Sequence, residues 1–426
     1  MFLTVSSSGF QAVCAVLALA MNARALGVRD FGILALVQAY AAMISSLATF
    51  ESWQPVIRLG VTSRLRLGLT LSSGILLDIC AAVAATTVAI GGILLFSPAV
   101  GIADGYRELA VIYSLSLLAG VAGTPKGFFR LRGRYSVLVG NQITQGLALL
   151  CASAALWFFE AGLEIYVICF ASIAATYNFS LFIRMLVHMR RDGVALVNPL
   201  RSALTRRYLR QVLRMALGTS LLSTLWNMRR NLSLFLVGAL IGPAATGVFA
   251  VGSKLANMVN RISGPLNQVL FPEIVKITHS SSGSDAARLT WRLSAIAAAI
   301  AVVLAAFAYL VREPIVLLAA GPGYQGAGTI FGLLFLAECI GLAGLHLNAV
   351  IQGLRGTGPL LLISTGALLL FFSLSVVLAG PVGVNGVAVA SVIGAMLMYV
   401  AMLITARFEL RGASRIAHEN KAGSDG

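Results

Sequence analysis

Long apolar runs, broken by short groups of glycine, proline and charged residues, make up most of this chain. A helix needs about 20 mostly apolar residues to cross a lipid bilayer. The runs reach this length and do not alternate as barrel strands do, so helices are predicted. We predict twelve transmembrane helices, over residues 2–23, 33–52, 69–96, 106–124, 136–158, 164–187, 211–241, 245–270, 291–311, 326–351, 359–379 and 384–406.

The composition agrees with an all-α polytopic membrane protein. Hydrophobic residues make up 58% of the chain and charged residues only 11%, with a mean hydropathy of +0.91. A soluble domain carries about 25% charged residues. The five cysteines all fall in apolar runs without a CxxC pair, so neither a metal site nor a disulfide framework is indicated. No cofactor is expected.

The formal net charge of +16 is interpreted as membrane topology rather than as nucleic-acid binding. Cytoplasmic loops of membrane proteins are enriched in Lys and Arg. If both termini are cytoplasmic, most of the 31 basic residues lie in inner segments. The basic residues outside these inner segments are Arg24, Arg29, Arg107 and Arg312 in outer loops, and Arg229, Arg230, Lys254 and Arg261 inside predicted helices. The first helix by itself favours the opposite orientation, because no basic residue precedes it.

An internal repeat divides the chain into two halves. Residues 26–32 and 241–247 both have an apolar residue, then Gly-x4-Gly, and Leu-Arg-Gly occurs at 131–133 and again at 354–356. The equal helix order predicts two six-helix lobes related by a pseudo-two-fold axis along the membrane normal. The predicted domains are a first lobe over 1–189, a basic cytoplasmic linker over 190–210, a second lobe over 211–406 and a cytoplasmic tail over 407–426.

Positive charges inside two predicted helices are the candidate functional residues. Each Lys or Arg at a helix centre costs about 2.5–3.5 kcal/mol on insertion scales. A polar stripe accompanies them in the helix over 211–241. At 100° per residue, Arg230 can reach the stripe, whereas Arg229 lies on the opposite side. The stripe comprises Ser220, Ser223, Thr224, Asn227 and Asn231, and the helix over 245–270 carries Lys254, Asn257 and Arg261.

Acidic residues in the predicted spans are too few to balance these bases. Asp78 and Glu338 lie within spans and Glu51 lies at an inner helix end. One interpretation is that Asp78 or Glu338 pairs with the bases and holds helices together. The other is a water-filled cationic cavity for an anion. Arginine forks and lysine ammonium groups both suit phosphate oxygens, so we favour the cavity.

Three segments resemble bacterial polysaccharide exporters of the lipid-linked oligosaccharide flippase (Wzx-like) type. They are FESWQPVIRLG over 50–60, GTPKGFFR over 123–130, and the run from Arg230 through the loop ending at Gly247. The resemblance places the chain in the multidrug/oligosaccharidyl-lipid/polysaccharide exporter superfamily. It implies two six-helix lobes, a cationic central cavity and alternating access in the bacterial inner membrane. The implied substrate is a polyprenyl-diphosphate-linked oligosaccharide, with membrane lipids, a polysaccharide polymerase and glycosyltransferases as the implied partners.

The chain departs from the family at one place. Members often carry an acid followed by arginine shortly before the second Gly-x4-Gly loop, where this chain has Ser233 and Leu234. Asp78 and Glu338 are therefore the remaining candidate coupling acids. The predicted substrate-binding residues are Arg230, Lys254, Arg261, Arg229, Asn227, Asn257 and, at the inner mouth, Arg58.

Two alternatives remain open. A drug or cation antiporter of the same superfamily would require acids in the membrane interior. A membrane-embedded polysaccharide polymerase or ligase would require a large outer loop, and the longest outer loop here has about 15 residues. A transporter rather than an enzyme is the prediction.

Overall fold

The computed structural model describes residues 2–48, 52–60, 64–96, 104–201, 203–259 and 283–422, and these ranges contain helices and no strand. The all-α class predicted from the sequence is confirmed. The chain divides into two compact units, Phe2–Gly247 and Val248–Gly426, with the boundary inside helix α9 (Pro243–Ala256). The lobe boundary predicted near 190–210 stays a prediction.

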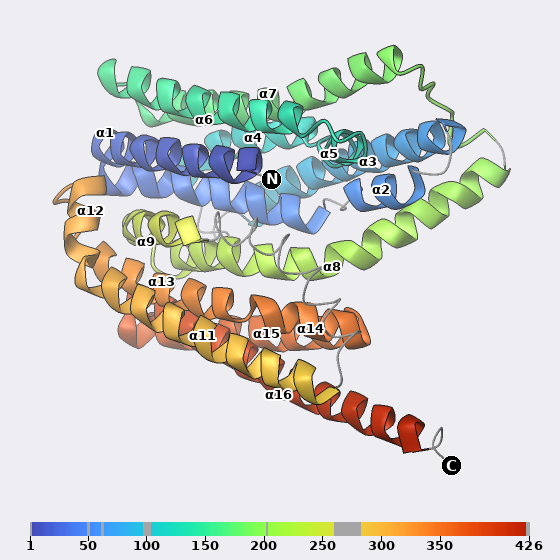
Figure 1. Cartoon of the computed structure of the whole chain (residues 1–426). Coiled ribbons are helices and arrows are strands. Elements are labelled where there is room, and N and C mark those ends of the chain that lie inside the picture. Colours follow the sequence, from blue (N-terminus) through green and yellow to red (C-terminus); the bar gives the residue numbers. More distant parts are fainter. Residues whose placement is uncertain are drawn as a thin grey trace. The chain divides into compact units, whose positions relative to one another are not determined.

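The first unit is a bundle of helices in which α1 packs against both α6 and α8 (Figure 1). Between its main helices lie two short 3-10 turns, η1 (Asp104–Tyr106) and η2 (Ser116–Ala119). Its helices are α1 (Phe2–Ala48), α2 (Trp53–Gly60), α3 (Arg64–Phe96), α4 (Arg107–Leu115), α5 (Gly123–Leu131), α6 (Tyr135–Phe158), α7 (Leu163–Arg191) and α8 (Ala203–Leu240).

Helix α1 contains the first two predicted spans. Its 47 residues would be about 70 Å long if straight, more than twice the thickness of the hydrocarbon core. The chain reverses at Gly27, where φ is 69° and ψ is 177°, values that favour glycine. Figure 1 shows the two runs of α1 side by side. The predicted spans 2–23 and 33–52 left a loop at residues 24–32. The structure has helix there instead, on both sides of the kink at Gly27.

Two predicted spans are interrupted. The one over 106–124 is divided into α4, η2 and a non-helical stretch at residues 120–122 before α5. Pro125 explains the restart, because proline has no N–H and suits only the first turn of a helix. The span over 326–351 is divided at Gly344 into α13 (Ala327–Ala343) and α14 (Leu345–Arg355).

The second unit is built from pairs of packed helices. Besides α13 and α14 it contains α11 (Gly283–Leu310), α12 (Arg312–Ala320), α15 (Gly358–Val382) and α16 (Val384–Ala422). Helix α16 packs against α15, α13, α11 and α14. It extends beyond residue 406, where the sequence predicted the last span to end, and Glu409 pairs with Arg355 at 3.0 Å. The segment after 406 is therefore helical as far as Ala422.

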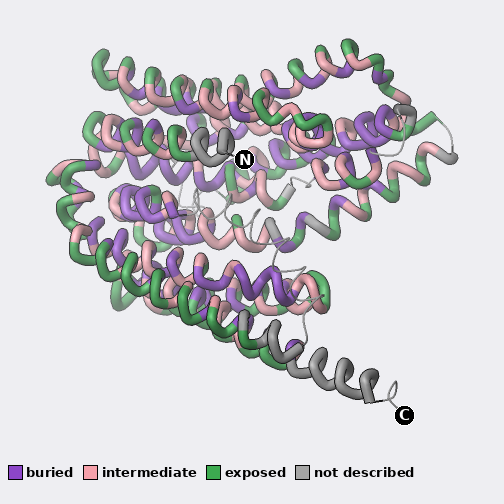
Figure 2. The backbone as a smooth tube through the Cα atoms, viewed as in Figure 1, coloured by how far each residue is buried: buried purple, intermediate pink, exposed green. Residues whose placement is uncertain are grey.

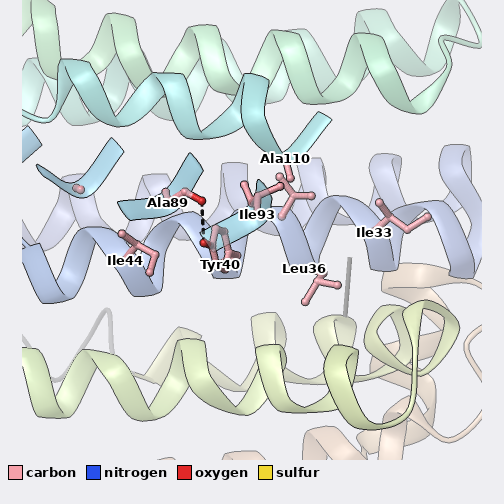
Figure 3. Packing of buried hydrophobic residues seen from close by; sticks show 9 residues of the cluster. Ile33, Leu36, Tyr40, Ile44, Ala89, Ile93 and Ala110 are labelled. Carbon is pink, nitrogen blue, oxygen red and sulfur yellow. Dashed lines mark hydrogen bonds between the residues drawn. The ribbon is translucent and has the colours of Figure 1, made fainter. Parts of the chain in front are cut away.

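One hydrophobic cluster joins α1 to α3, α4 and α8 in the first unit (Figure 3). Ile33 and Tyr40 of α1 pack with Ala89 and Ile93 of α3, and all four are buried. The Tyr40 hydroxyl donates a hydrogen bond of 2.8 Å to the carbonyl oxygen of Ala89. Leu36 points toward α8 in Figure 3, and a Cβ on Gly238 would lie 2.5 Å from its side chain. Small residues thus allow the helices to approach closely.

The outer faces of the helices are apolar and exposed. Within each unit, Figure 2 shows buried and exposed turns alternating along single helices. Leu95, Phe158 and Leu362 are 76%, 81% and 79% exposed, which is expected of side chains that face lipid. Nine segments in the described part of the chain are long and apolar enough to cross a membrane. The protein is a multi-pass membrane protein.

Candidate functional site

The polar stripe predicted over residues 220–231 lies entirely within α8, which is uninterrupted. The Thr224 hydroxyl donates a hydrogen bond of 3.0 Å to the carbonyl oxygen of Ser46 in α1, so this part of the stripe faces the unit's interior. Ser220 is buried and bonds to the carbonyl of Ala216 in its own helix. Asn227 is exposed and Asn231 is half-buried. The stripe therefore runs from a packed end to an accessible end.

Arg229 and Arg230 lie in the last third of α8. Both side chains are half-buried, and the Nε atom of Arg230 is itself buried. The next turn of α8 is apolar and tightly packed, with Leu232, Leu234 and Leu236 all buried. Adjacent positions on a helix point about 100° apart, so the two guanidinium groups leave the helix on different sides. The structure thus places two cations at the edge of a buried apolar segment.

Lys254 and Asn257 lie together in the second unit at the end of α9. The Asn257 amide donates a 3.4 Å hydrogen bond to the hydroxyl of Ser253, while the Lys254 side chain is exposed. A Cβ on Gly252 would lie 2.9 Å from Ile330, so α9 packs closely on α13. Arg261 lies outside the described residues. That these groups converge with Arg230 on one substrate stays a prediction.

The other predicted site residues lie in separate places. Arg58 is exposed in the last turn of α2. Glu338 is half-buried in α13, beside the buried Cys339. Glu51 lies outside the described residues. Among the described residues, no group of three His, Cys, Asp or Glu side chains could hold a metal ion.

Asp78 forms a buried polar junction between three helices. Its Oδ1 accepts a hydrogen bond of 2.6 Å from the hydroxyl of Ser52, just before α2, and its Oδ2 accepts one of 2.8 Å from the backbone N–H of Thr124 in α5. The first N–H groups of a helix have no partner within the helix, and an acid there also interacts favourably with the helix dipole. Asp78 of α3 thus caps α5 and anchors α2.

Glycines make this junction possible. A Cβ on Gly123 would collide with the Ser52 hydroxyl, and one on Gly74 would lie 2.5 Å from Thr124 Oγ1. A Cβ on Gly127 would lie 2.8 Å from the Cα of Trp53. The Arg130 guanidinium lies over the Trp53 ring at 4.5 Å, which adds a cation–π contact between α5 and α2. Residues 52–60 and 123–130, far apart in the sequence, thus form one packed site.

The amino-acid pattern singles out Asp78 but not its partners. Ser52 and Thr124 are 72 positions apart, and only the tertiary fold brings both to one carboxyl group. Their signal in the sequence was their place inside the two segments that resemble the exporters. The coupling role suggested for Asp78 stays a prediction, and its observed contacts describe an anchor.

The two Gly-x4-Gly segments pack against each other. A Cβ on Gly32 would collide with the carbonyl oxygen of Pro243, and a Cβ on Gly247 would collide with the carbonyl oxygen of Val28. Each segment thus receives the backbone of the other at its second glycine. Two related turns that meet about a local two-fold axis make such a reciprocal contact.

Comparison with known proteins places the chain in a family. A family model described as "Polysaccharide biosynthesis protein" matches residues 1–278, more than half of the chain. The chain belongs to the polysaccharide biosynthesis protein family. The match includes α1–α9 and therefore contains the Asp78 junction, both Gly-x4-Gly segments and the arginines of α8.

A curated relative supports this family's membrane setting. Inner membrane protein YghQ of Escherichia coli (strain K12) is 24% identical over 341 residues, which cover 76% of this chain and 92% of that protein.

Solved structures with the same fold are membrane transporters. An inward-facing multidrug resistance MATE family transporter of the MOP superfamily matches with a TM-score of 0.72 at 16% identity, covering 95% of this chain and 96% of that one. The lipid II flippase MurJ, in an inward closed conformation, matches with a TM-score of 0.67 at 12% identity, covering 97% and 90%. At these identities the likeness shows the fold alone.

Proposed function

We propose that this protein flips a polyprenyl-diphosphate-linked oligosaccharide across the bacterial inner membrane by alternating access. Membership of the polysaccharide biosynthesis protein family is the observation that carries the proposal. In the proposal, the polysaccharide is assembled outside the membrane, which needs its lipid-linked repeat unit on the outer leaflet. The fold shared with membrane transporters supplies a scaffold that can perform this movement.

The charges of α8 support an anionic substrate. Arg229 and Arg230 lie between apolar stretches of α8, and each would cost about 2.5–3.5 kcal/mol at the centre of a membrane-spanning helix. In the proposal they meet the diphosphate, with Asn227 as an amide donor beside them. Charge-assisted hydrogen bonds to phosphate oxygens are about twice as strong as neutral ones. Lys254, Arg261 and Asn257 complete the predicted contact set, and Arg58 collects the headgroup at the inner mouth.

Replacement of Arg230 tests the proposal. Arg230→Gln keeps a polar side chain and removes the charge, so we expect initial flipping rates to fall about tenfold or more. Arg210→Gln makes the same change on the exposed start of α8 and should keep the wild-type rate. The assay uses purified protein in liposomes that contain a fluorescent polyprenyl-diphosphate sugar, with a membrane-impermeant quencher reporting the leaflet.

The same assay separates this proposal from its alternatives. The sugar lipid should change leaflet without changing its mass, whereas a polymerase or ligase would change the mass. A drug or cation antiporter would move a cationic dye and leave the sugar lipid in its original leaflet. Wild-type flipping rates in Arg230→Gln would contradict the role given to that side chain.

A further inference from the structure

A surface groove lies between α3 and the segment that joins α7 to α8. Its volume is about 270 Å³, and its walls are one face of α3 and residues 196–200. Ser72, Ile75 and Ile79 contribute the α3 wall, at spacings that share one helix face. Ile79, Leu196 and Leu200 are 43%, 53% and 50% exposed, so apolar side chains line an accessible opening.

The two walls are fixed to each other. The backbone N–H of Val197 donates a 2.9 Å hydrogen bond to the hydroxyl of Ser72, which itself donates one of 2.8 Å to the carbonyl of Gly68. A Cβ on Gly68 would collide with the carbonyl oxygen of Ala195, so the joining segment lies directly on the α3 backbone. Val194 is buried in the cluster that includes Leu71. The groove is thus part of the folded unit.

Positive charge lies at one end of the groove. The Arg206 Nε donates a 3.1 Å hydrogen bond to the carbonyl oxygen of Leu200, a residue that lines the groove. Arg201 and Arg207 are exposed nearby in the sequence. Asp192, the acid that precedes this segment, pairs with Arg134 at 2.8 Å and with Arg132 at 3.5 Å. No Asp or Glu occurs between Gly193 and Leu240, so the charge of this region is positive.

The α3 wall of the groove lies within Arg66–Phe96, a helical segment long and apolar enough to cross a membrane. Ser72 and Ile79 follow Arg66 by 6 and 13 residues, or about 9 and 20 Å along a helix. The hydrocarbon core is about 30 Å thick, so one leaflet spans about 15 Å. With Arg66 at the headgroup level, the α3 wall of the groove lies about 9–20 Å from it, at the depth of the acyl chains.

We propose that this groove binds one acyl chain of an anionic glycerophospholipid, with the headgroup phosphate held by Arg206. An apolar channel beside an arginine fits such a lipid, because the chain loses contact with water and the phosphate gains a charge-assisted hydrogen bond. Both walls belong to one unit and are hydrogen-bonded together, which favours a resident lipid over a substrate that must leave. The proposal does not depend on which substrate the protein transports.

Native mass spectrometry of the purified full-length protein tests this binding. The detergent-solubilised protein is titrated with phosphatidylglycerol or with phosphatidylcholine of the same acyl chains. We expect one retained phosphatidylglycerol per protein and about tenfold weaker retention of phosphatidylcholine. Ile79→Trp fills the groove and Arg206→Gln removes the charge, so each should weaken phosphatidylglycerol retention by about tenfold or more.

Matched variants make the result specific. Leu95→Trp places the same ring on an exposed site of the same helix, and Arg210→Gln removes an exposed charge further along α8. Both should retain phosphatidylglycerol as the wild type does, and thermal melting should show all four variants folded. The proposal is overturned if both lipids are retained equally, if Ile79→Trp or Arg206→Gln binds normally, or if polyprenyl phosphate displaces phosphatidylglycerol at equimolar concentration.

Discussion

At the scale of single residues, two glycines decide how closely the repeated segments approach. Gly32 and Gly247 each face a backbone carbonyl oxygen of the other segment, of Pro243 and Val28 respectively. A backbone atom cannot rotate away as a side-chain end can, so a methyl group at either position forces the segments apart. Overpacking in a well-packed core typically costs about 1–3 kcal/mol.

Gly32→Ala should therefore lower the thermal stability of the purified protein. We expect a loss of about 1–3 kcal/mol, measured as a lower melting temperature in detergent. Gly91→Ala is the matched control, because Gly91 is also helical and a Cβ there meets no atom within 4 Å. Alanine is a better helix former than glycine, so the control should melt at or above the wild-type temperature. Equal melting temperatures of the two variants would contradict the close contact between Gly32 and the backbone of Pro243.

At the scale of elements, one carboxyl group holds three helices together. Asp78 accepts hydrogen bonds from Ser52 and from the Thr124 N–H, and it is buried. Removal of one partner from such a group leaves the other buried without its hydrogen bond, which costs more than the bond contributes net. The positions of α2 and α5 on α3 thus depend on this junction.

Ser52→Ala should destabilise the protein by about 1.5–3 kcal/mol, the range for hydrogen bonds to charged groups. Ser172→Ala is the control, since the Ser172 hydroxyl is exposed and bonds only to the carbonyl of Ile168 in its own helix. Thermal unfolding in the same detergent compares the two variants. A control as unstable as Ser52→Ala would show that loss of other serine hydroxyls has the same effect, and would remove the special role of the junction.

At the scale of the whole molecule, basic residues predict the orientation in the membrane. Helix α7 offers a direct test, because Glu164 lies in its first turn and Arg191 in its last. Its 29 residues span about 44 Å, enough to place these two side chains on opposite sides of the bilayer. The excess of Lys and Arg at the Arg191 end predicts that this end lies in the cytoplasm.

Cysteine labelling in intact cells measures this orientation. In a variant without the five native cysteines, Glu164→Cys should react with a membrane-impermeant maleimide. Arg191→Cys should react only after the cells are permeabilised. Labelling of Arg191→Cys in intact cells would reverse the predicted topology.

The amino-acid sequence determined the class of the protein. Long apolar runs cannot remain in water, and a helix satisfies its own backbone hydrogen bonds in lipid, so the helical class and the order of most spans follow from local composition. The ends of α6, α7 and α15 agree closely with the predicted spans. The resemblance of three short segments also indicated the family, and the family match confirms it.

Only the tertiary structure decided which distant residues meet. Hydropathy reports whether a residue prefers lipid or water, but it carries no information about its partners across the bundle. It therefore placed Asp78 inside a span and did not reveal that Ser52 and Thr124 satisfy its two oxygens. Likewise, the repeat identified Gly32 and Gly247 as equivalent, and the fold alone showed that each receives the other's backbone, because such contacts arise from packing between helices.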